Sequence, residues 1–335
     1  MDTLILGADE VEKAAQIIKN GGLVAMPTET VYGLAADALN GNAVANIFKA
    51  KGRPMDNPLI VHISDISQIT GLVREFPENA RRLAEKFWPG PLTIILPKSD
   101  NIPDEVSAGL DTVAVRFPSH PVAKALIGAS CPLAAPSANL SGSPSPTTLR
   151  HVIDDMNGRI DAIIDGGDCA VGVESTVITL AEGKPRILRP GGITAEQIRS
   201  VIGETDIDAA VTAPLADGQK ASSPGMKYKH YSPKAEVILL DGSDDDFAEY
   251  IRNEYDDKTA VLCYNEEKDV LPCMCIPVGA KNDDSAYAYH LFAALREADE
   301  RKCSRVYAHC PKKEGIGLAV YNRIIRAAGF KVIKL

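Results

Sequence analysis

The chain has 335 residues, a formal net charge of -9, 45% hydrophobic residues and 24% charged residues. This length favours two folding units or one large one, and the composition is that of a globular protein rather than a disordered one. The acidic balance argues against broad electrostatic binding to nucleic acid, which needs an extended basic surface. Any anion site must therefore be local.

The sequence also argues against a membrane or secreted protein. No apolar stretch is long enough to cross a bilayer, and the N-terminal MDTLILGADEVEK carries acids before any cation, unlike a secretory leader. Seven cysteines spread through a long chain indicate reduced thiols rather than a disulfide framework. We therefore expect a cytoplasmic protein with no membrane contact.

The first part of the chain alternates between helical and extended patterns, which predicts an α/β fold. Helix-like segments cover 11–20 and 78–88. Short apolar, strand-like runs cover 23–28, 59–64, 91–97, 112–117 and 160–165. Residues 176–190 form two further runs around a Gly-containing turn, which predicts a hairpin and hence a mixed sheet. A helix at 193–203 ends this first domain, residues 1–203.

Residues 204–234 lose periodicity and are rich in Ala, Ser, Pro, Gly and Lys, which is typical of a linker. The stretch 226–231, MKYKHY, is better suited to contact than to solvation. From 235 to 335 the α/β alternation restarts, which predicts a small, doubly wound, Rossmann-like domain. Its acid-rich stretch at 244–246 is interpreted as a solvated helix start.

A cluster of cations stands at 49–58, KAKGRPMDNP. Asn42 is a candidate N-cap of a helix that Gly52 and Pro54 end, so Lys49, Lys51 and Arg53 fall at its C-terminal end. Cations there either offset the helix dipole in solvent or form an anion site.

Several extended segments place polar side chains on one face. The two-residue period of a strand sets Arg116 beside the small Ala114, and sets His62 on the less apolar side of 59–64. A lone strand histidine is more often structural than functional. Further polar positions follow in LAAPSANLSG, in the Ser-rich loop after it and at the two ends of the hairpin: Ala135, Ser137, Asn139, Ser145, Ser175 and Arg189.

Several catalytic motifs are missing. The chain contains no GxxxxGK[ST] phosphate loop, no GxSxG nucleophile elbow and no HExxH zinc helix. Cys273 and Cys275 have no second cysteine pair at zinc spacing, so we interpret them as small core residues. Cys169 lacks a histidine at local spacing that would support a nucleophile. A covalent mechanism is not indicated.

The motifs of YrdC-like domains occur in the expected order: PTETVYGLAADAL, KAKGRPMDNPLIVHI, FWPGPLTIIL, TVAVRFP, LAAPSANLSGSPSPT, GVESTVI and ILRPGGIT. The linker PGMKYKHYSP matches the long form. From end to end, the chain resembles the two-domain threonylcarbamoyl-AMP synthase family. The resemblance implies a twisted, mixed-sheet catalytic domain followed by a smaller Rossmann-like domain.

The resemblance also implies a nucleotidyltransferase reaction. L-threonine, bicarbonate or CO2, and ATP with Mg²⁺ give threonylcarbamoyl-AMP and pyrophosphate. A downstream tRNA threonylcarbamoyl-transferase complex then modifies the adenosine beside the anticodon of certain tRNAs.

Site residues follow from the resemblance, position by position. Lys51 and Arg53 are the expected catalytic residues. The residues expected to bind ATP are Lys51, Arg53, Asn57, Thr112, Ser137, Asn139, Ser145, Arg189 and Tyr231. The residues expected to bind L-threonine are Thr30, His62, Arg116, Ala135 and Ser175. The metal ligands stay unknown. Ile178-Thr179 stands where many relatives carry an acid, so the metal or hydroxyl contact of that carboxylate is not carried over to this chain.

The sequence supports three further hypotheses. The linker, through Lys229 and Tyr231, is a candidate lid over the nucleotide. The main alternative function is an RNA-binding module of the same fold, which would bind with a steep salt dependence and without threonine. A carbamoyl-transfer role in hydrogenase maturation is a second alternative, but the accompanying catalytic modules are absent from the sequence.

Overall fold

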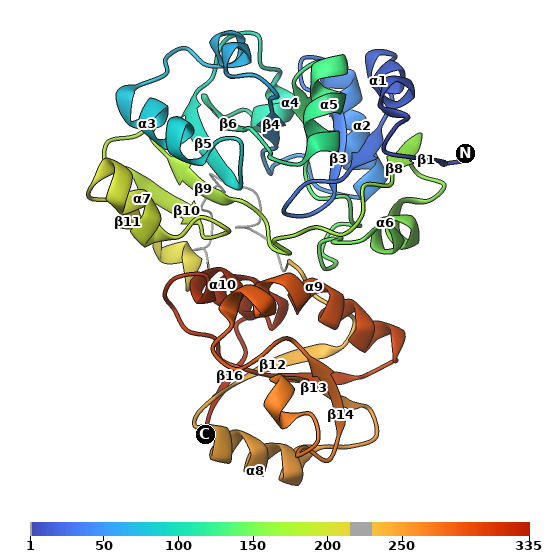
Figure 1. The fold of residues 1–335 in the computed structure, drawn as a ribbon, viewed down its shortest axis with the longest axis vertical. Coiled ribbons are helices and arrows are strands. Elements are labelled where there is room, and N and C mark those ends of the chain that lie inside the picture. Colours follow the sequence, from blue (N-terminus) through green and yellow to red (C-terminus); the bar gives the residue numbers. More distant parts are fainter. Residues whose placement is uncertain (1, 215–229) are drawn as a thin grey trace.

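The computed structural model describes residues 2–214 and 230–335, which form two α/β domains stacked along the longest axis of the molecule (Figure 1). The first domain lies above the second in this view, and helices α9 (Asp284–Glu300) and α10 (Gly317–Ala327) of the second domain face the first. No helix in the described ranges has the length and apolarity needed to span a membrane.

The first domain contains, within the described residues, an eleven-stranded sheet in the order β1-β8-β2-β3-β7-β4-β6-β5-β9-β10-β11. Parallel and antiparallel neighbours alternate irregularly, so the predicted mixed sheet is confirmed. Its strands are β1 (Leu4–Leu6), β2 (Val24–Met26), β3 (Gly33–Asp37), β4 (Ile60–His62), β5 (Leu92–Pro97), β6 (Thr112–Arg116), β7 (Leu133–Ala134), β8 (Ala162–Ile164), β9 (Thr176–Thr179), β10 (Arg186–Arg189) and β11 (Asp206–Ile207).

The hairpin predicted at 176–190 is confirmed as the antiparallel pair β9 and β10. Strand β11 lies beyond residue 203 and pairs parallel with β10, so the first sheet extends past that expected boundary. The 3₁₀ turn η2 (Ala209–Val211) follows it directly.

Helices pack on this sheet with their apolar faces inward. They are α1 (Val11–Lys19), α2 (Gly41–Lys51), α3 (Glu78–Phe87), α4 (Asp104–Ser107), α5 (Pro121–Ala129), α6 (Leu149–Met156) and α7 (Ala195–Ile202), with the 3₁₀ turn η1 at Ile66–Gly71. The main core spans the buried side chains of α2, α3 and the central strands, and a second apolar cluster lies between α1, α5 and the β1-β8-β2 edge.

The predicted N-cap of α2 is wrong. The helix begins at Gly41, and the side chain of Asn40, not that of Asn42, accepts a hydrogen bond from the backbone N–H of Ala43 at 3.2 Å. Asn40 has the extended backbone that an N-cap residue needs, whereas Asn42 is already inside the first turn. The predicted C-terminal end is confirmed, because Gly52 is the left-handed C-cap.

The second domain has a five-stranded, all-parallel sheet in the order β14-β13-β15-β12-β16. This is the doubly wound arrangement that the sequence predicts, with α9 and α10 on one face and α8 on the other (Figure 1). The elements are β12 (Glu236–Asp241), α8 (Asp244–Glu254), β13 (Thr259–Cys263), η3 (Asn265–Glu267), β14 (Met274–Pro277), α9, β15 (Arg305–His309), α10 and β16 (Val332–Lys334).

The acid-rich stretch at 244–246 is exposed and forms the first turn of α8, as predicted, and the structure adds Ser243 as its N-cap. Cys273 and Cys275 are half-buried and pack against the cluster between α8 and the sheet.

Glycine at position 191 allows two backbone segments of the first domain to meet. A Cβ at Gly191 would lie 2.3 Å from the carbonyl oxygen of Glu174 and 2.4 Å from the backbone nitrogen of Thr176. The loop after β10 therefore touches the segment that leads into β9, and no larger residue fits without moving main chain.

We expect Gly191→Ala to lower the free energy of unfolding by about 2 kcal/mol or more, because the contact involves backbone that cannot rotate away. Urea denaturation would measure the shift in midpoint. Gly71→Ala is the matched control, since a Cβ there meets no atom within 4 Å. Equal midpoints for the two variants would contradict this account.

Candidate active site

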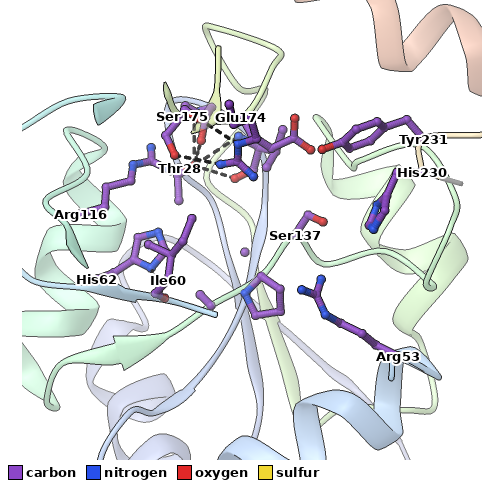
Figure 2. Close-up of a pocket in the computed structure, with 16 residues that line it drawn as sticks. Thr28, Arg53, Ile60, His62, Arg116, Ser137, Glu174, Ser175, His230 and Tyr231 are labelled. Atoms are coloured by element: carbon purple, nitrogen blue, oxygen red, sulfur yellow. Dashed lines mark hydrogen bonds between the residues drawn. The ribbon is translucent and has the colours of Figure 1, made fainter. Parts of the chain in front are cut away.

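A pocket in the first domain opens where β4, β6 and β7 meet the loops before β3 and β9 (Figure 2). It leaves about 560 Å³ free of protein atoms, part of it open to solvent. Its lining is Thr28, Thr30, Val31, Gly33, Arg53, Ile60, His62, Arg116, Ala135, Pro136, Ser137, Glu174, Ser175, Arg189, His230 and Tyr231. Nine of the fourteen predicted site residues are in this set.

Sheet register places two of the predicted residues side by side. Strands β4 and β6 run parallel, and His62 is the register partner of Arg116. Burial, and then the charge of Arg116, lower the pKa of His62 to about 3, so the ring is neutral at physiological pH. Its Nδ1 lies 3.2 Å from the carbonyl oxygen of Ile60, which orients the ring.

Arg116 is buried and paired with a residue that the sequence analysis missed. Its Nη2 lies 2.7 Å from Oε1 of Glu29. Burial alone would raise the pKa of Glu29, but Arg116 holds it below its ordinary value. The carboxylate thus keeps the guanidinium in place beside the pocket, where a ligand carboxylate can approach it.

Hydroxyls and the guanidinium of Arg189 line the part of the pocket around Ser175 and Thr28, two residues labelled in Figure 2. The Oγ of Ser175 lies 2.8 Å from Oγ1 of Thr93 and accepts a hydrogen bond from Nη2 of Arg189 at 3.1 Å. Thr28 and Thr30 join their hydroxyls at 2.9 Å in the loop before β3. Ser175 and Arg189, predicted from the two ends of the hairpin, are therefore brought together.

The cation cluster at 49–58 divides into three roles. Lys49 is exposed and donates a hydrogen bond to Asn46, as expected of a cation that stays in solvent at the end of the helix. Lys51 is buried, and its Nζ donates to the carbonyl oxygens of Ser137 and Asn139, at 2.5 Å each. Burial lowers the pKa of Lys51 well below its ordinary value. Arg53 alone of these three lines the pocket.

The Ser-x-Asn loop is built around Lys51. The side chain of Asn139 accepts a hydrogen bond from Oγ of Ser137 at 2.5 Å and donates to the carbonyls of Leu140 and Ser143. Ser137 therefore faces the pocket while Asn139 and Lys51 shape the loop from behind. Asn57 also lies outside the pocket lining. Its backbone carbonyl accepts a hydrogen bond from Nη2 of Arg53 at 3.3 Å, so it helps to hold that guanidinium.

Two other predicted nucleotide contacts lie outside the pocket lining. The Oγ of Ser145 donates to Oε1 of Glu174 at 2.5 Å, one layer behind the wall. Thr112 begins β6, four residues and roughly 13 Å of strand from Arg116. It lines a separate depression with Thr179 and Arg186.

The linker contributes His230 and Tyr231 to the pocket. Tyr231 is 4% exposed and has a positive φ of 62°, which is uncommon for an aromatic residue. Residues 215–229 lie outside the described residues, and with them Lys229 and most of the expected lid.

The pocket holds three arginines, Arg53, Arg116 and Arg189, and one acid, Glu174. This balance suits an anionic ligand, even though the whole chain is acidic. Glu29 and Glu174 are not among the predicted site residues, although each directly precedes one of them, Thr30 or Ser175, in a motif of the sequence.

Metal-ligating side chains do not gather at the pocket among the described residues. Among the described residues, one group of three potential metal ligands has its ligand atoms within 4.8 Å of one another. It lies in the second domain and consists of Asp244, Glu267 and His309. These already have protein partners, since Lys281 pairs with Asp244, and Nε2 of His309 lies 2.7 Å from Oε1 of Glu267.

Comparison with known proteins covers nearly the whole chain. Residues 16–191 match the protein family described as "Telomere recombination", and residues 193–329 match the family described as "Threonylcarbamoyl-AMP synthase, C-terminal domain". The threonylcarbamoyl-AMP synthase of Pyrococcus abyssi is 47% identical over 97% of this chain and 96% of its own length. That of Bacillus subtilis is 46% identical over 99% of this chain and 97% of its own length.

A solved structure is similar to both domains together. The crystal structure of P. abyssi Sua5 complexed with L-threonine has a TM-score of 0.92 and 46% identity, and the match covers 99% of this chain and all of the other.

We expect His62 to make the protein less stable in acid. The unfolded ring has an ordinary pKa near 6.5 and takes up a proton as pH falls, whereas the folded ring resists protonation down to about 3. Stability is therefore lost as pH decreases, by about 2 kcal/mol between pH 7 and 5 from this residue.

Urea denaturation of the unliganded protein at pH 7 and 5 would measure that loss. In His62→Gln, the loss of unfolding free energy between pH 7 and pH 5 should be smaller than in the wild type by about 2 kcal/mol. In the exposed control His290→Gln, the loss should equal that of the wild type. An unchanged loss in His62→Gln would show that the ring is protonated in the folded state.

Proposed function

The chain belongs to the threonylcarbamoyl-AMP synthase family, and on that basis we propose that its pocket makes threonylcarbamoyl-AMP and pyrophosphate from L-threonine, bicarbonate or CO2, and ATP. The observation that carries this proposal is the convergence of Arg53, Arg116 and Arg189 with a neutral histidine and a row of hydroxyls in one pocket. Such a set can hold an amino acid at one end and phosphates at the other.

We assign the threonine end to Arg116, His62, Thr30 and Ser175. Arg116 presents a guanidinium fork to the substrate carboxylate, and Glu29 behind it fixes its position. The hydroxyls of Thr30 and Ser175 suit the polar groups of threonine. The backbone at Ala135, on the pocket wall, is the remaining expected contact.

The first chemical step joins threonine and CO2. The amine must be neutral to attack the carbon, and a site lined by the cation Arg116 and the buried, neutral His62 disfavours its ammonium form. The new N–C bond gives a carbamate, and the amine loses its proton to solvent or bicarbonate.

The second step is nucleotidyl transfer, which makes the enzyme a nucleotidyltransferase. A carbamate oxygen attacks the α-phosphorus of ATP, and the bond to the bridging oxygen of pyrophosphate breaks. Catalysis of this kind depends on positioning and on neutralising charge. Arg53, Arg189 and Ser137 face the nucleotide end, while Lys51 and Asn139 fix the loop that carries Ser137.

Magnesium is expected to enter with the nucleotide. The described residues offer hydroxyls and one carboxylate at the pocket, which is too few for a protein-built cage but enough for an ion that keeps phosphate and water ligands. The hydroxyl of Ser137, on the pocket wall, is a candidate oxygen donor, whereas both oxygens of Glu174 already accept hydrogen bonds from Ser145 and Arg323. When bound, Mg²⁺ supplies neutralisation of the phosphate charge.

The product is a mixed anhydride that water hydrolyses, so the enzyme that uses it must receive it quickly. We propose that a tRNA threonylcarbamoyl-transferase complex takes the product and that both act in the cytoplasm.

The direct test uses purified protein with Mg²⁺, α-labelled ATP and bicarbonate, with and without L-threonine. We expect labelled threonylcarbamoyl-AMP that requires threonine and disappears when EDTA is added. Serine at equal concentration controls for general amino-acid adenylation. Absence of product, with RNA retained by the folded protein in a salt-dependent way, would favour the RNA-binding alternative.

Arg116→Lys tests the threonine end separately. Lysine keeps the charge but lacks the fork, so we expect the KM for threonine to rise at least about tenfold, with the KM for ATP changed less than about threefold. Arg74→Lys, at an exposed ion pair with Asp100, is the matched control. An equal rise in both KM values would contradict the assignment.

A further inference from the structure

A side chain of the second domain reaches the wall of the pocket. Arg323, on α10, is fully buried, and its Nε donates to Oε2 of Glu174 at 2.6 Å. Its Nη2 donates to the carbonyl oxygen of Pro190 at 3.0 Å, in the loop after β10. Arg323 therefore binds two segments of the first domain at once.

Glu174 is held from both domains. Its Oε1 accepts from Ser145 in the first domain and its Oε2 from Arg323 in the second. Burial alone would raise the pKa of Glu174, but Arg323 and then Arg189 hold it below its ordinary value. The carboxylate is thus a fixed negative charge at the pocket, matched by a fixed positive one.

The same guanidinium supports Tyr231. Its carbon lies 5.5 Å from the centre of the Tyr231 ring, at cation–π distance. The ring also packs on Phe292 of α9, with centroids 5.2 Å apart. Figure 2 shows Tyr231 and Glu174 as neighbours on one side of the pocket.

Helix α10 is well anchored at this point. Asn322 donates to the carbonyl of Val211 at 2.7 Å and accepts from Nη1 of Arg323 at 2.6 Å. Arg326, one turn later, donates to the carbonyl of Ala210 at 2.7 Å. Arg323 therefore projects from a rigid support.

We propose that Arg323 is a positioning residue for the nucleotide end of the pocket, and that it acts by neutralising Glu174. Without it, Glu174 would lose its ion-pair partner, and its negative charge would oppose the binding of a triphosphate beside Arg53 and Arg189. The second domain thereby sets the charge of a pocket built on the first. This inference rests on the proposed function, because it takes ATP as the ligand.

The experiment measures ATP binding by calorimetry, together with KM values, on the full-length protein. Arg323→Leu should weaken ATP binding and raise the KM for ATP at least about tenfold, with the KM for threonine changed less than about threefold. Arg326→Leu is the matched control, since it removes an arginine bond between the domains on the same helix but leaves Glu174 paired. It should change each value less than about threefold.

The double variant Glu174→Gln, Arg323→Leu separates charge from mere support. Removing both charges should recover most of the ATP affinity that Arg323→Leu loses. The double variant should also be more stable than Arg323→Leu, because no unpaired charge stays buried. No recovery in the folded double variant, equal loss in Arg326→Leu, or unchanged ATP affinity in folded Arg323→Leu would each overturn the proposal.

A pH series gives a second readout that loss of packing would not change. In Arg323→Leu, a buried Glu174 lacking its main partner takes up a proton more readily, so ATP affinity relative to wild type should improve from pH 8 to pH 6. A ratio that does not change with pH would count against the proposal. Since calorimetry needs no turnover, wild-type protein that binds ATP without making product would refute the proposed function and leave this inference standing.

Discussion

Burying a positive charge requires a partner, and the pocket is organised around that requirement. Three buried cations here each have a fixed acceptor: Glu29 for Arg116, main-chain carbonyls for Lys51, and Glu174 for Arg323. Removing one partner from either of the two ion pairs, Arg116 with Glu29 or Arg323 with Glu174, costs several kcal/mol, about 3–5 in typical cases, because the other charge stays buried. The pairs therefore hold the side chains where a ligand needs them.

The three partnerships work at different levels of the fold. The pair of Arg116 and Glu29 joins a strand to a nearby loop, and Lys51 joins the end of a helix to the loop after β7. The pair of Glu174 and Arg323 joins two domains. The first two organise the pocket from within a single sheet, whereas the third makes its electrostatics depend on a separate folding unit.

Much of the first domain could be predicted from the sequence because strand and helix periods are local properties. The two-residue period placed Arg116 and His62 on polar faces, and the sheet then brought them into register. The Gly-containing turn gave the hairpin that joins Ser175 to Arg189. The position of the cap of α2 was missed by two residues, since Asn40 and Asn42 are both good caps and the backbone conformation chooses between them.

The inward direction of Lys51 could not be predicted, because a cation at a helix end is usually solvated and the carbonyls that bind it come from a loop 86 and 88 residues away. The link from Arg323 to Glu174 spans 149 residues, and no periodicity or motif connects them. Tertiary pairing of this kind becomes visible when the two domains are seen in place.

The contact between the domains also constrains how such a protein changes over time. Val31 and Val173 of the first domain pack into the core of the second, so the junction is apolar as well as ionic. A substitution at position 174 that removes the charge leaves an unmatched guanidinium, and the reverse holds at position 323. In this chain the charges at positions 174 and 323 are therefore coupled, and a change of either is tolerated best together with a matching change of the other.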